Sequence, residues 1–190
     1  MQASELVVEG GITEIFGRAS SGRTSLLVAC LHEVTRRGAL VALVDTDHVF
    51  DPVGAARAGV ELSRVLWVRC GRRPERALRA ADLLVRCPGF ALVALDTGAL
   101  TPQLTLAAAY RLKLAVLRTR TALVVVARHR IVASGATLAL ETSRRGFQWA
   151  GPRAAPTRLE GAGTAVSVVR ARGTAVELRP GNVHLAWWSA

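Results

Sequence analysis

Five short apolar runs, separated by segments with helical periodicity, most constrain how this chain can fold. The runs are rich in Val, Ile, Leu and Ala and cover Gly11–Phe16, Ala39–Val44, Val65–Val68, Phe90–Leu95 and Thr121–Val126. The predicted helices cover Arg23–Arg37, Pro74–Arg86 and Gln103–Thr119. Strands that alternate with helices are joined by crossover connections, which make the strands parallel and cover the sheet with helices. The sequence therefore predicts an α/β fold with a mainly parallel central sheet.

The pattern changes after Arg130. Two segments, TLALETSRRGFQWAG and AVSVVRARGTAVELRP, each indicate two short strands joined at an Arg-Gly turn. The stretch between them, GPRAAPTRLEGAG, is rich in Gly and Pro and reads as a loop. We therefore expect antiparallel β-hairpins over about 136–180 to follow a core over about 11–130. We expect the 190 residues to form one domain, with no separate domain at either end.

Charge and hydropathy limit the class of partner. The formal net charge is +11, from 25 basic and 14 acidic residues. Such a charge favours the binding of polyanions such as DNA. The alternative is that the arginines reflect a biased composition and form a solvated surface without a nucleic-acid partner. No apolar run reaches the roughly 20 residues that span a bilayer, and the N-terminus lacks a basic signal-peptide region. We expect a cytoplasmic, nucleoid-associated protein with no membrane partner.

The segment GRASSGRTS has the layout of a phosphate-binding loop. It follows the predicted strand ITEIF and precedes a predicted helix, and its two glycines allow backbone amides to turn inward around an anion at the helix N-terminus. It predicts a site for ATP or ADP with Mg²⁺. The predicted nucleotide-binding residues are Gly17, Arg18, Ala19, Ser20, Ser21, Gly22, Arg23, Thr24, Ser25 and Asp96.

Two of these residues would hold the metal ion. Thr24 occupies the position of the hydroxyl that ligates Mg²⁺, and Asp96 ends a buried strand in FALVALD, as the second metal-site carboxylate of such proteins does. The alternative for Asp96 is a strand-end carboxylate that caps a turn. Arg23 stands where the loop lysine belongs, and its wide guanidinium replaces a slim ammonium. We therefore expect phosphate binding in a looser form and little hydrolysis.

Three segments together resemble the ATP-binding core of bacterial RecA recombinases. These are GITEIFGRASSGRTSLL, ALVDTDHVFDPVGAARAGVELSRVLWV and ALVALDTGALTP, in this order and spacing. The resemblance implies a RecA-like fold. It also places Asp47, in DTDHVFDP, at the catalytic glutamate that orients the attacking water. Aspartate is one methylene shorter, so the resemblance implies a degenerate catalytic residue.

The departures from RecA point to a subtype. Arg128 falls where RecA has a glutamine that senses the γ-phosphate, and few residues separate HRIV from GATLALE, where RecA has a long DNA-binding loop. Only about ten residues precede Gly11, so the polymerising arm is expected to be absent. This pattern resembles the short RecA-like ImuA proteins of bacterial mutagenesis cassettes. That resemblance implies an accessory role in the SOS response and translesion synthesis, with an ImuB-like Y-family polymerase homologue, an error-prone polymerase or RecA as partner.

Two other functions remain open on sequence grounds. One is an active nucleotide-dependent ATPase or switch of the RecA superfamily, and the other is sequence-independent DNA binding through arginine side chains. The C-terminal Trp187 and Trp188 are either a partner anchor or a segment docked on the sheet. The candidate DNA-binding residues, which otherwise form a solvated helix face, are Arg111, Lys113, Arg118, Arg120, Arg128 and Arg130.

Overall fold

The computed structural model describes residues 2–100, 104–152, 157–172 and 181–186. The strands are β1 (Ile12–Gly17), β2 (Leu40–Asp45), β3 (Val65–Arg69), β4 (Phe90–Asp96), β5 (Ala122–Ala127), β6 (Leu138–Ala150), β7 (Arg158–Ala171) and β8 (Gly181–Ala186). The helices are α1 (Ala3–Leu6), α2 (Arg23–Arg36), α3 (Pro52–Arg57), α4 (Pro74–Arg86) and α5 (Leu106–Thr119). Short 3₁₀ turns cover Leu62–Arg64 and Ala133–Gly135.

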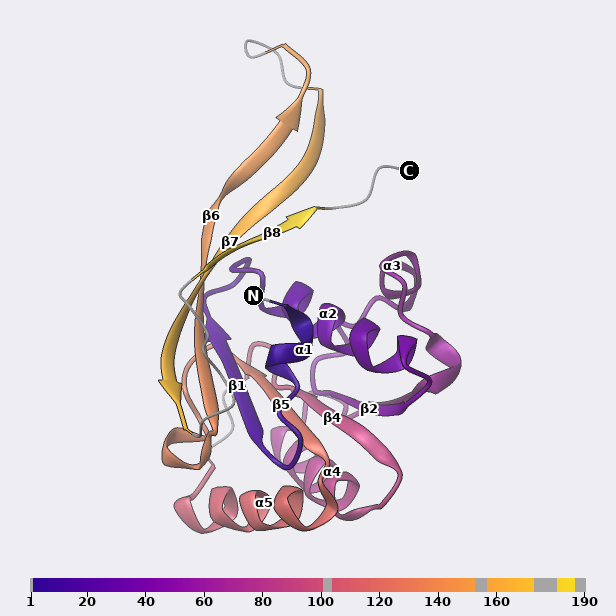
Figure 1. Ribbon diagram of the computed structural model, residues 1–190, viewed down its shortest axis with the longest axis vertical. Helices are drawn as coiled ribbons and strands as arrows, with labels where there is room; N and C mark the ends of the chain where they lie inside the picture. The colour runs from indigo at the N-terminus through magenta and orange to yellow at the C-terminus, as the bar shows by residue number, and fades with distance from the viewer. Residues whose placement is uncertain (1, 101–103, 153–156, 173–180, 187–190) are drawn as a thin grey trace.

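The described strands form one sheet in the order β3-β2-β4-β5-β1-β6-β7-β8 (Figure 1). Pairing is parallel from β3 through β6 and antiparallel between β6, β7 and β8. This arrangement confirms the predicted α/β class, with a mainly parallel sheet that ends in antiparallel strands.

Helices cover both faces of the parallel part. On one face, α1 and α2 bury Leu6, Leu27 and Leu31 against the sheet. On the other face, α4 and α5 bury Ala81 and Val116. Because both faces are covered, the inner strands β2, β4 and β5 are nearly continuous apolar runs rather than alternating patterns, whereas β1 also buries Thr13 and Glu14.

The C-terminal strands differ from the prediction. The segment TLALETSRRGFQWAG was expected to turn at Arg145-Gly146, but β6 runs continuously from Leu138 to Ala150. It pairs with β7, and two of the register shifts in that pairing fall at Arg144/Gly146 and Gln148/Trp149. The predicted turn is therefore wrong, because an irregularity inside a long paired strand can hold a glycine without reversing the chain.

The second predicted hairpin is only partly described. Its first strand lies within β7, which also includes residues expected to be loop, and its predicted second strand falls within 173–180, outside the described residues. Trp187 and Trp188 also lie outside them. Figure 1 shows the β6–β7 hairpin projecting beyond the helix-covered core.

The parallel topology brings the ends of four strands to one edge of the sheet. β1, β2, β4 and β5 end at Gly17, Asp45, Asp96 and Ala127. Asp45 is the register partner of Asp96, and Phe16 is the register partner of Ala127. Ligands of open parallel sheets bind outside this carboxyl edge, so the candidate site lies there. In the described part of the chain, no helix is long and apolar enough to cross a membrane.

Candidate functional site

The loop between β1 and α2 has the backbone of an anion-binding turn. Gly22 occupies the N-cap position of α2 with φ +91°, and Ser20 also has a positive φ, at +58°. Such left-handed positions let successive amides converge, and the N-terminus of α2 adds the positive end of its dipole. Arg18, Ala19, Ser20 and Thr24 are exposed, whereas Ser21 is buried.

The loop packs against the β6–β7 hairpin. Thr142, on β6, donates its hydroxyl hydrogen to the carbonyl of Phe16 at 3.2 Å. The Ser21 hydroxyl lies 2.6 Å from the Thr142 hydroxyl and is therefore the donor of that bond. A Cβ at Gly17 would overlap the Thr142 carbonyl, and a Cβ at Gly22 would overlap the Thr164 side chain on β7. The hairpin thus sets the position of the loop.

Arg23 occupies the first turn of α2, is half-buried and interacts with the charge of Asp96 at the end of β4. Burial lowers the pKa of its guanidinium, Asp96 raises it again, and Arg128 lowers it further. Its Nη1 atom is buried and has no hydrogen-bond partner among the described residues. A buried cationic donor without a partner is costly, so an anion bound at the loop would satisfy it.

Asp96, at the end of β4, is 7% exposed. Its Oδ1 accepts a hydrogen bond from the amide of Gly98 at 2.8 Å. Burial is the largest influence on its pKa and raises it. The Gly98 bond and Arg23 oppose this effect, whereas the charges of Asp45 and Asp47 add to it. Asp96 therefore both caps the turn after β4 and faces the Arg23 charge, so the two interpretations of the sequence are compatible.

Asp47, the predicted counterpart of the catalytic glutamate, contacts the loop after β4. Its Oδ2 accepts from the amide of Ala99 at 2.7 Å, while its Oδ1 is buried without a partner among the described residues. A Cβ at Gly98, whose φ is +63°, would overlap the Asp47 carboxylate. One oxygen of Asp47 thus accepts a hydrogen bond from the loop after β4, and the other has no hydrogen-bond partner among the described residues.

Sequence reasoning missed the role of Asp45. This carboxylate is buried and accepts from the amides of Val49 and Phe50 and from the indole nitrogen of Trp67, at 3.0–3.2 Å. It therefore holds the segment that carries Asp47. The signal was present in DTDHVFDP, which has three aspartates at and after the end of a buried strand, of which only Asp47 has a predicted role.

The predicted nucleotide site is consistent with a phosphate group. One of the four buried side-chain atoms without partners in the described chain, the donor Arg23 Nη1, belongs to it, and a phosphate oxygen would accept its hydrogen bond. The loop amides and Arg23 would hold the phosphates of ATP or ADP, and Thr24 with Asp96 would hold the Mg²⁺ that shields their charge. Thr24 is exposed at the first turn of α2. The described residues contain no group of three His, Cys, Asp or Glu side chains placed to bind a metal alone.

The six predicted DNA-binding residues come from α5 and from both ends of β5. Arg111, Lys113 and Arg118 belong to α5. Arg120 precedes β5, and Arg128 follows it, so the six-residue strand separates them by about 20 Å. The basic residues are therefore spread along the molecule, and their binding to DNA stays a prediction.

Two of these arginines form ion pairs. Arg120 pairs with Glu9 at 2.6 Å, and both side chains are exposed. Arg130 lies 3.5 Å from the fully buried Glu14 and donates to the carbonyl of Ala133. Arg130 therefore serves the local structure after β5, whereas the Arg120 pair is a solvent-exposed contact that contributes little to stability.

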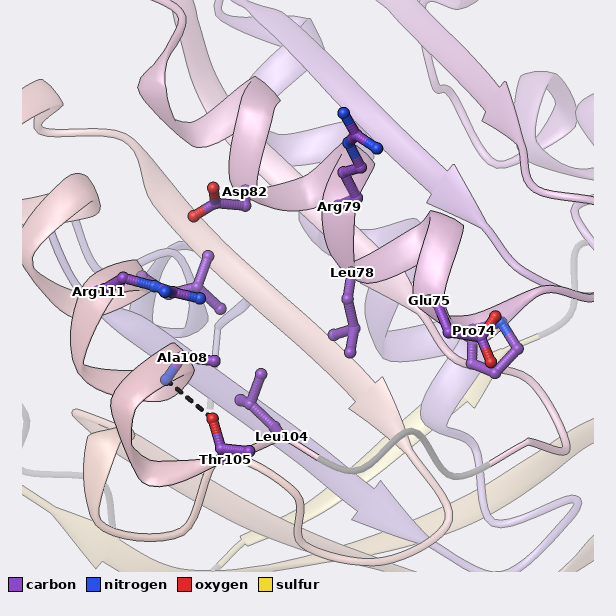
Figure 2. A pocket seen from close by; sticks show the side chains of 10 residues that line it. Pro74, Glu75, Leu78, Arg79, Asp82, Leu104, Thr105, Ala108 and Arg111 are labelled. Atoms are coloured by element: carbon purple, nitrogen blue, oxygen red, sulfur yellow. Dashed lines mark hydrogen bonds between the residues drawn. The ribbon is translucent and has the colours of Figure 1, made fainter.

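A pocket of about 630 Å³ lies between α4 and α5 (Figure 2). Leu78, Leu104 and Ala108 supply apolar walls, and Arg111 extends from α5 into the space below Asp82. Both helices cover the sheet face opposite α2, so this pocket is separate from the phosphate-binding loop.

Comparison with known proteins agrees with this geometry. The RecA N-terminal domain family model matches residues 5–131. RecA of Borrelia turicatae is 41% identical over 95 residues, which are 50% of this chain and 26% of that protein. RecA of Prochlorococcus marinus is 41% identical over 96 residues, with the same coverage. The chain thus matches only about a quarter of the length of these relatives.

A solved structure extends the likeness to nearly the whole chain. The crystal structure of the RadB recombinase superposes with a TM-score of 0.66, covering 95% of this chain and 88% of that one at 16% identity. At such low identity the likeness establishes the fold, including the C-terminal strands beyond the family match. The family model match over residues 5–131, two thirds of the chain, shows that this chain belongs to the RecA N-terminal domain family.

Proposed function

We propose that this protein is an ImuA-like accessory protein of bacterial DNA damage tolerance, with a degenerate nucleotide site. It would act in translesion synthesis by contacting an ImuB-like Y-family polymerase homologue or an error-prone polymerase, and by contacting RecA or DNA. The proposal combines the RecA N-terminal domain match with departures at the positions where a recombinase performs its chemistry.

The main observation in support of this proposal is the short connection between β5 and β6. It consists only of residues 128–137, where RecA recombinases have a long DNA-binding loop. The buried Glu14 accepts hydrogen bonds from the amides of Ile131 and of Val132, the latter at 2.8 Å. A short connection fixed to the core in this way cannot extend along a DNA strand, so recombinase activity is not expected.

The nucleotide site supports binding more than hydrolysis. Arg23 carries the required charge, but its guanidinium is partly buried and interacts with the charges of both Asp96 and Arg128. Asp47 commits one oxygen to the Ala99 amide. Fast phosphoryl transfer depends on close positioning of the phosphates and the attacking water, and both residues depart from that arrangement. ATP or ADP with Mg²⁺ would then stabilise a conformation rather than be consumed.

An active nucleotide-dependent ATPase or switch of the RecA superfamily is the second candidate, because Arg23 Nη1 is buried without a partner among the described residues and could hold a phosphate. An active enzyme would show ATP turnover that requires Mg²⁺ and that the substitution Thr24→Ala abolishes. We expect instead that the unaltered protein and Thr24→Ala hydrolyse ATP at the same background rate in a single-turnover assay.

The accessory role is tested by direct association. The purified chain, mixed with an ImuB-like Y-family homologue, is expected to elute as a complex in size-exclusion chromatography and to form no regular filaments with ATP and single-stranded DNA under the electron microscope. Regular filaments of the pure chain would overturn the accessory role. A failure to bind the ImuB-like homologue would overturn the ImuA-like assignment and leave the RecA-type fold unaffected.

A further inference from the structure

Helix α5 presents an apolar stripe to solvent in addition to its buried face. Its inner face buries Ala109, Leu112, Ala115 and Val116. Four large apolar side chains follow a second line along the helix at three- and four-residue spacing. They are Leu106, Tyr110, Leu114 and Leu117, exposed by 72%, 61%, 49% and 54%.

This arrangement is unusual for a helix that covers a sheet. A surface helix normally buries one apolar stripe and exposes a polar face, whereas α5 is apolar on two sides. Scattered exposed apolar residues need no explanation, but a contiguous line of four marks an interaction surface. From Leu106 to Leu117 the line rises about 16 Å, which matches three turns of a second helix. Figure 1 shows α5 at the periphery of the molecule, on the outside of the sheet.

Basic residues border this stripe on both sides. Helical spacing places Lys113 beside Leu106 and Leu117 on one side, and Arg118 beside Leu114 on the other. Neither residue takes part in the ion pairs found among the described residues. The segment LAAAYRLKLAVLRT contains no acidic residue, so nothing on α5 itself neutralises them.

We propose that the stripe on α5 docks an amphipathic helix of a partner protein, with apolar residues at its centre and acidic residues along its borders. The apolar centre supplies the buried area, and the acidic borders pair with Lys113 and Arg118. A second copy of this chain is a poor occupant, since two α5 helices would bring like charges together. DNA is a poor occupant because phosphates do not bury leucine side chains.

The stripe on α5 would be the surface through which the proposed accessory function, on which this proposal rests, contacts its protein partner. It also changes the interpretation of Lys113 and Arg118, which the sequence suggested as phosphate contacts. On this surface they select the charge of a protein partner.

The test uses the full chain and three fluorescein-labelled helical peptides of about 18 residues each, a length that covers the stripe. The first has a leucine face bordered by glutamates. The second has lysines in place of the glutamates, and the third has serines in place of the leucines. Fluorescence anisotropy is expected to show binding of the first peptide only. Equal binding of the lysine or serine peptide, or no binding of the first, would overturn the proposal.

Variants locate the contact. Tyr110→Ser and Leu114→Ser are expected to weaken binding of the acidic peptide at least about tenfold, as loss of a central interface residue does. Leu83→Ser is the matched control, because Leu83 on α4 is 61% exposed, as Tyr110 is. The charge reversal Arg118→Glu is expected to lower affinity for the acidic peptide and to raise it for the lysine peptide. An equal loss in Leu83→Ser would overturn the assignment to α5.

Two further measurements test whether a second copy of this chain or DNA, rather than a partner helix, occupies the stripe on α5. Light scattering is expected to show the same mass for the unaltered chain and for Leu114→Ser, whereas dissociation of a dimer by that substitution would assign the stripe to a second copy. Single-stranded DNA binding is expected to be the same in both proteins, and its loss in Leu114→Ser would assign the stripe to nucleic acid. Either opposite result overturns the proposal. Failure of peptide binding leaves the nucleotide and ImuB-like partner tests of the accessory function intact.

Discussion

At the scale of single residues, the carboxyl edge of the sheet brings three aspartates and one arginine together where they are partly shielded from water. Asp96 is buried beside Asp45 and Asp47, and Arg23 provides the compensating positive charge. Burial dominates both groups, since it raises the pKa of Asp96 and lowers the pKa of Arg23. The charged forms of both residues are therefore held at some cost to the folded state, and a bound ligand would offset that cost.

The raised pKa of Asp96 predicts a dependence of stability on pH. The folded protein keeps the Asp96 proton to a higher pH than the unfolded chain does, so this carboxyl stabilises the fold at low pH. That contribution is lost as pH rises from the ordinary aspartate value through the raised one. Asp96→Asn, which retains an oxygen for the Gly98 amide, is expected to have a higher Tm than the unaltered protein at about pH 7.5 and a smaller difference at about pH 4.5.

Thermal unfolding at both pH values checks this expectation. Asp82→Asn serves as the control, since Asp82 is a partly exposed carboxylate paired with Arg86 on the surface of α4. A lower Tm of Asp96→Asn at neutral pH would mean that attraction to Arg23 outweighs burial.

At the scale of elements, contacts from the antiparallel strands determine how the phosphate-binding loop and the β5–β6 connection are held. Thr142 and Thr164 come from β6 and β7, more than a hundred residues after the loop that they contact. Glu14, in the middle of β1, holds the connection after β5. Both contacts join segments that are distant in sequence, so each is formed only when the sheet is complete.

The packing of Gly22 against β7 predicts a large cost for Gly22→Ala. The added Cβ would overlap Thr164, and the left-handed backbone adds strain. We expect a loss of roughly 2–4 kcal/mol in the free energy of unfolding, from about 1 kcal/mol of backbone strain and the remainder from overpacking. Gly89→Ala is the matched control, because Gly89 has φ +110° and no atom within 4 Å of the added Cβ. Urea unfolding that gives equal losses for both variants would contradict the contact between loop and hairpin.

The burial of Glu14 predicts that Glu14→Gln loosens the β5–β6 connection and lowers the stability of the fold. Glu14→Gln removes the charge that accepts two amide hydrogen bonds and faces Arg130. We expect a loss of about 1–3 kcal/mol in the free energy of unfolding. Hydrogen exchange at the amides of Ile131 and Val132 is expected to accelerate. Glu141→Gln, at an exposed position of β6, is expected to change neither quantity. Unchanged exchange in Glu14→Gln would indicate that the connection is held by other contacts.

At the scale of the whole molecule, the net charge of +11 is spread over separate surfaces. The candidate DNA-binding residues lie on α5, at the amino edge of β5 and at its carboxyl edge. Nucleic-acid binding would therefore come from the overall field rather than from one built site. The stripe on α5 gives part of this charge a different role, in selecting an acidic protein partner.

The distribution of charge predicts weak DNA binding without sequence preference. Affinity for a fluorescein-labelled single strand is expected to fall by at least about tenfold between 50 mM and 200 mM salt, since phosphate contacts release counterions. Arg118→Gln and Arg128→Gln are each expected to reduce affinity only slightly. Fluorescence anisotropy across a salt titration measures both effects. A flat salt dependence, or loss of binding through one substitution, would show a localised site.

Local patterns were sufficient to predict the core of the fold. The helix Pro74–Arg86 begins and ends where the sequence indicated, because a proline at the first turn and an apolar periodicity define it. The strand ending at Asp96 and the loop from Gly17 to Gly22 were recognisable for the same reason. The continuous β6 was not predictable, because long-range pairing with β7 overrides the local preference for a turn at Gly146.

The sequence by itself therefore determined the α/β class, the family and the place of the candidate phosphate-binding loop between β1 and α2, since each depends on short-range periodicity or on a compact motif. Tertiary structure alone decided which charges meet. It bonded Asp45 to the amide of Phe50, brought the charge of Arg23 close to Asp96, separated Arg120 from Arg128, and left Leu114 exposed on α5. The physical reason is that burial and electrostatic interaction depend on distance in space, which the order of residues along the chain does not specify.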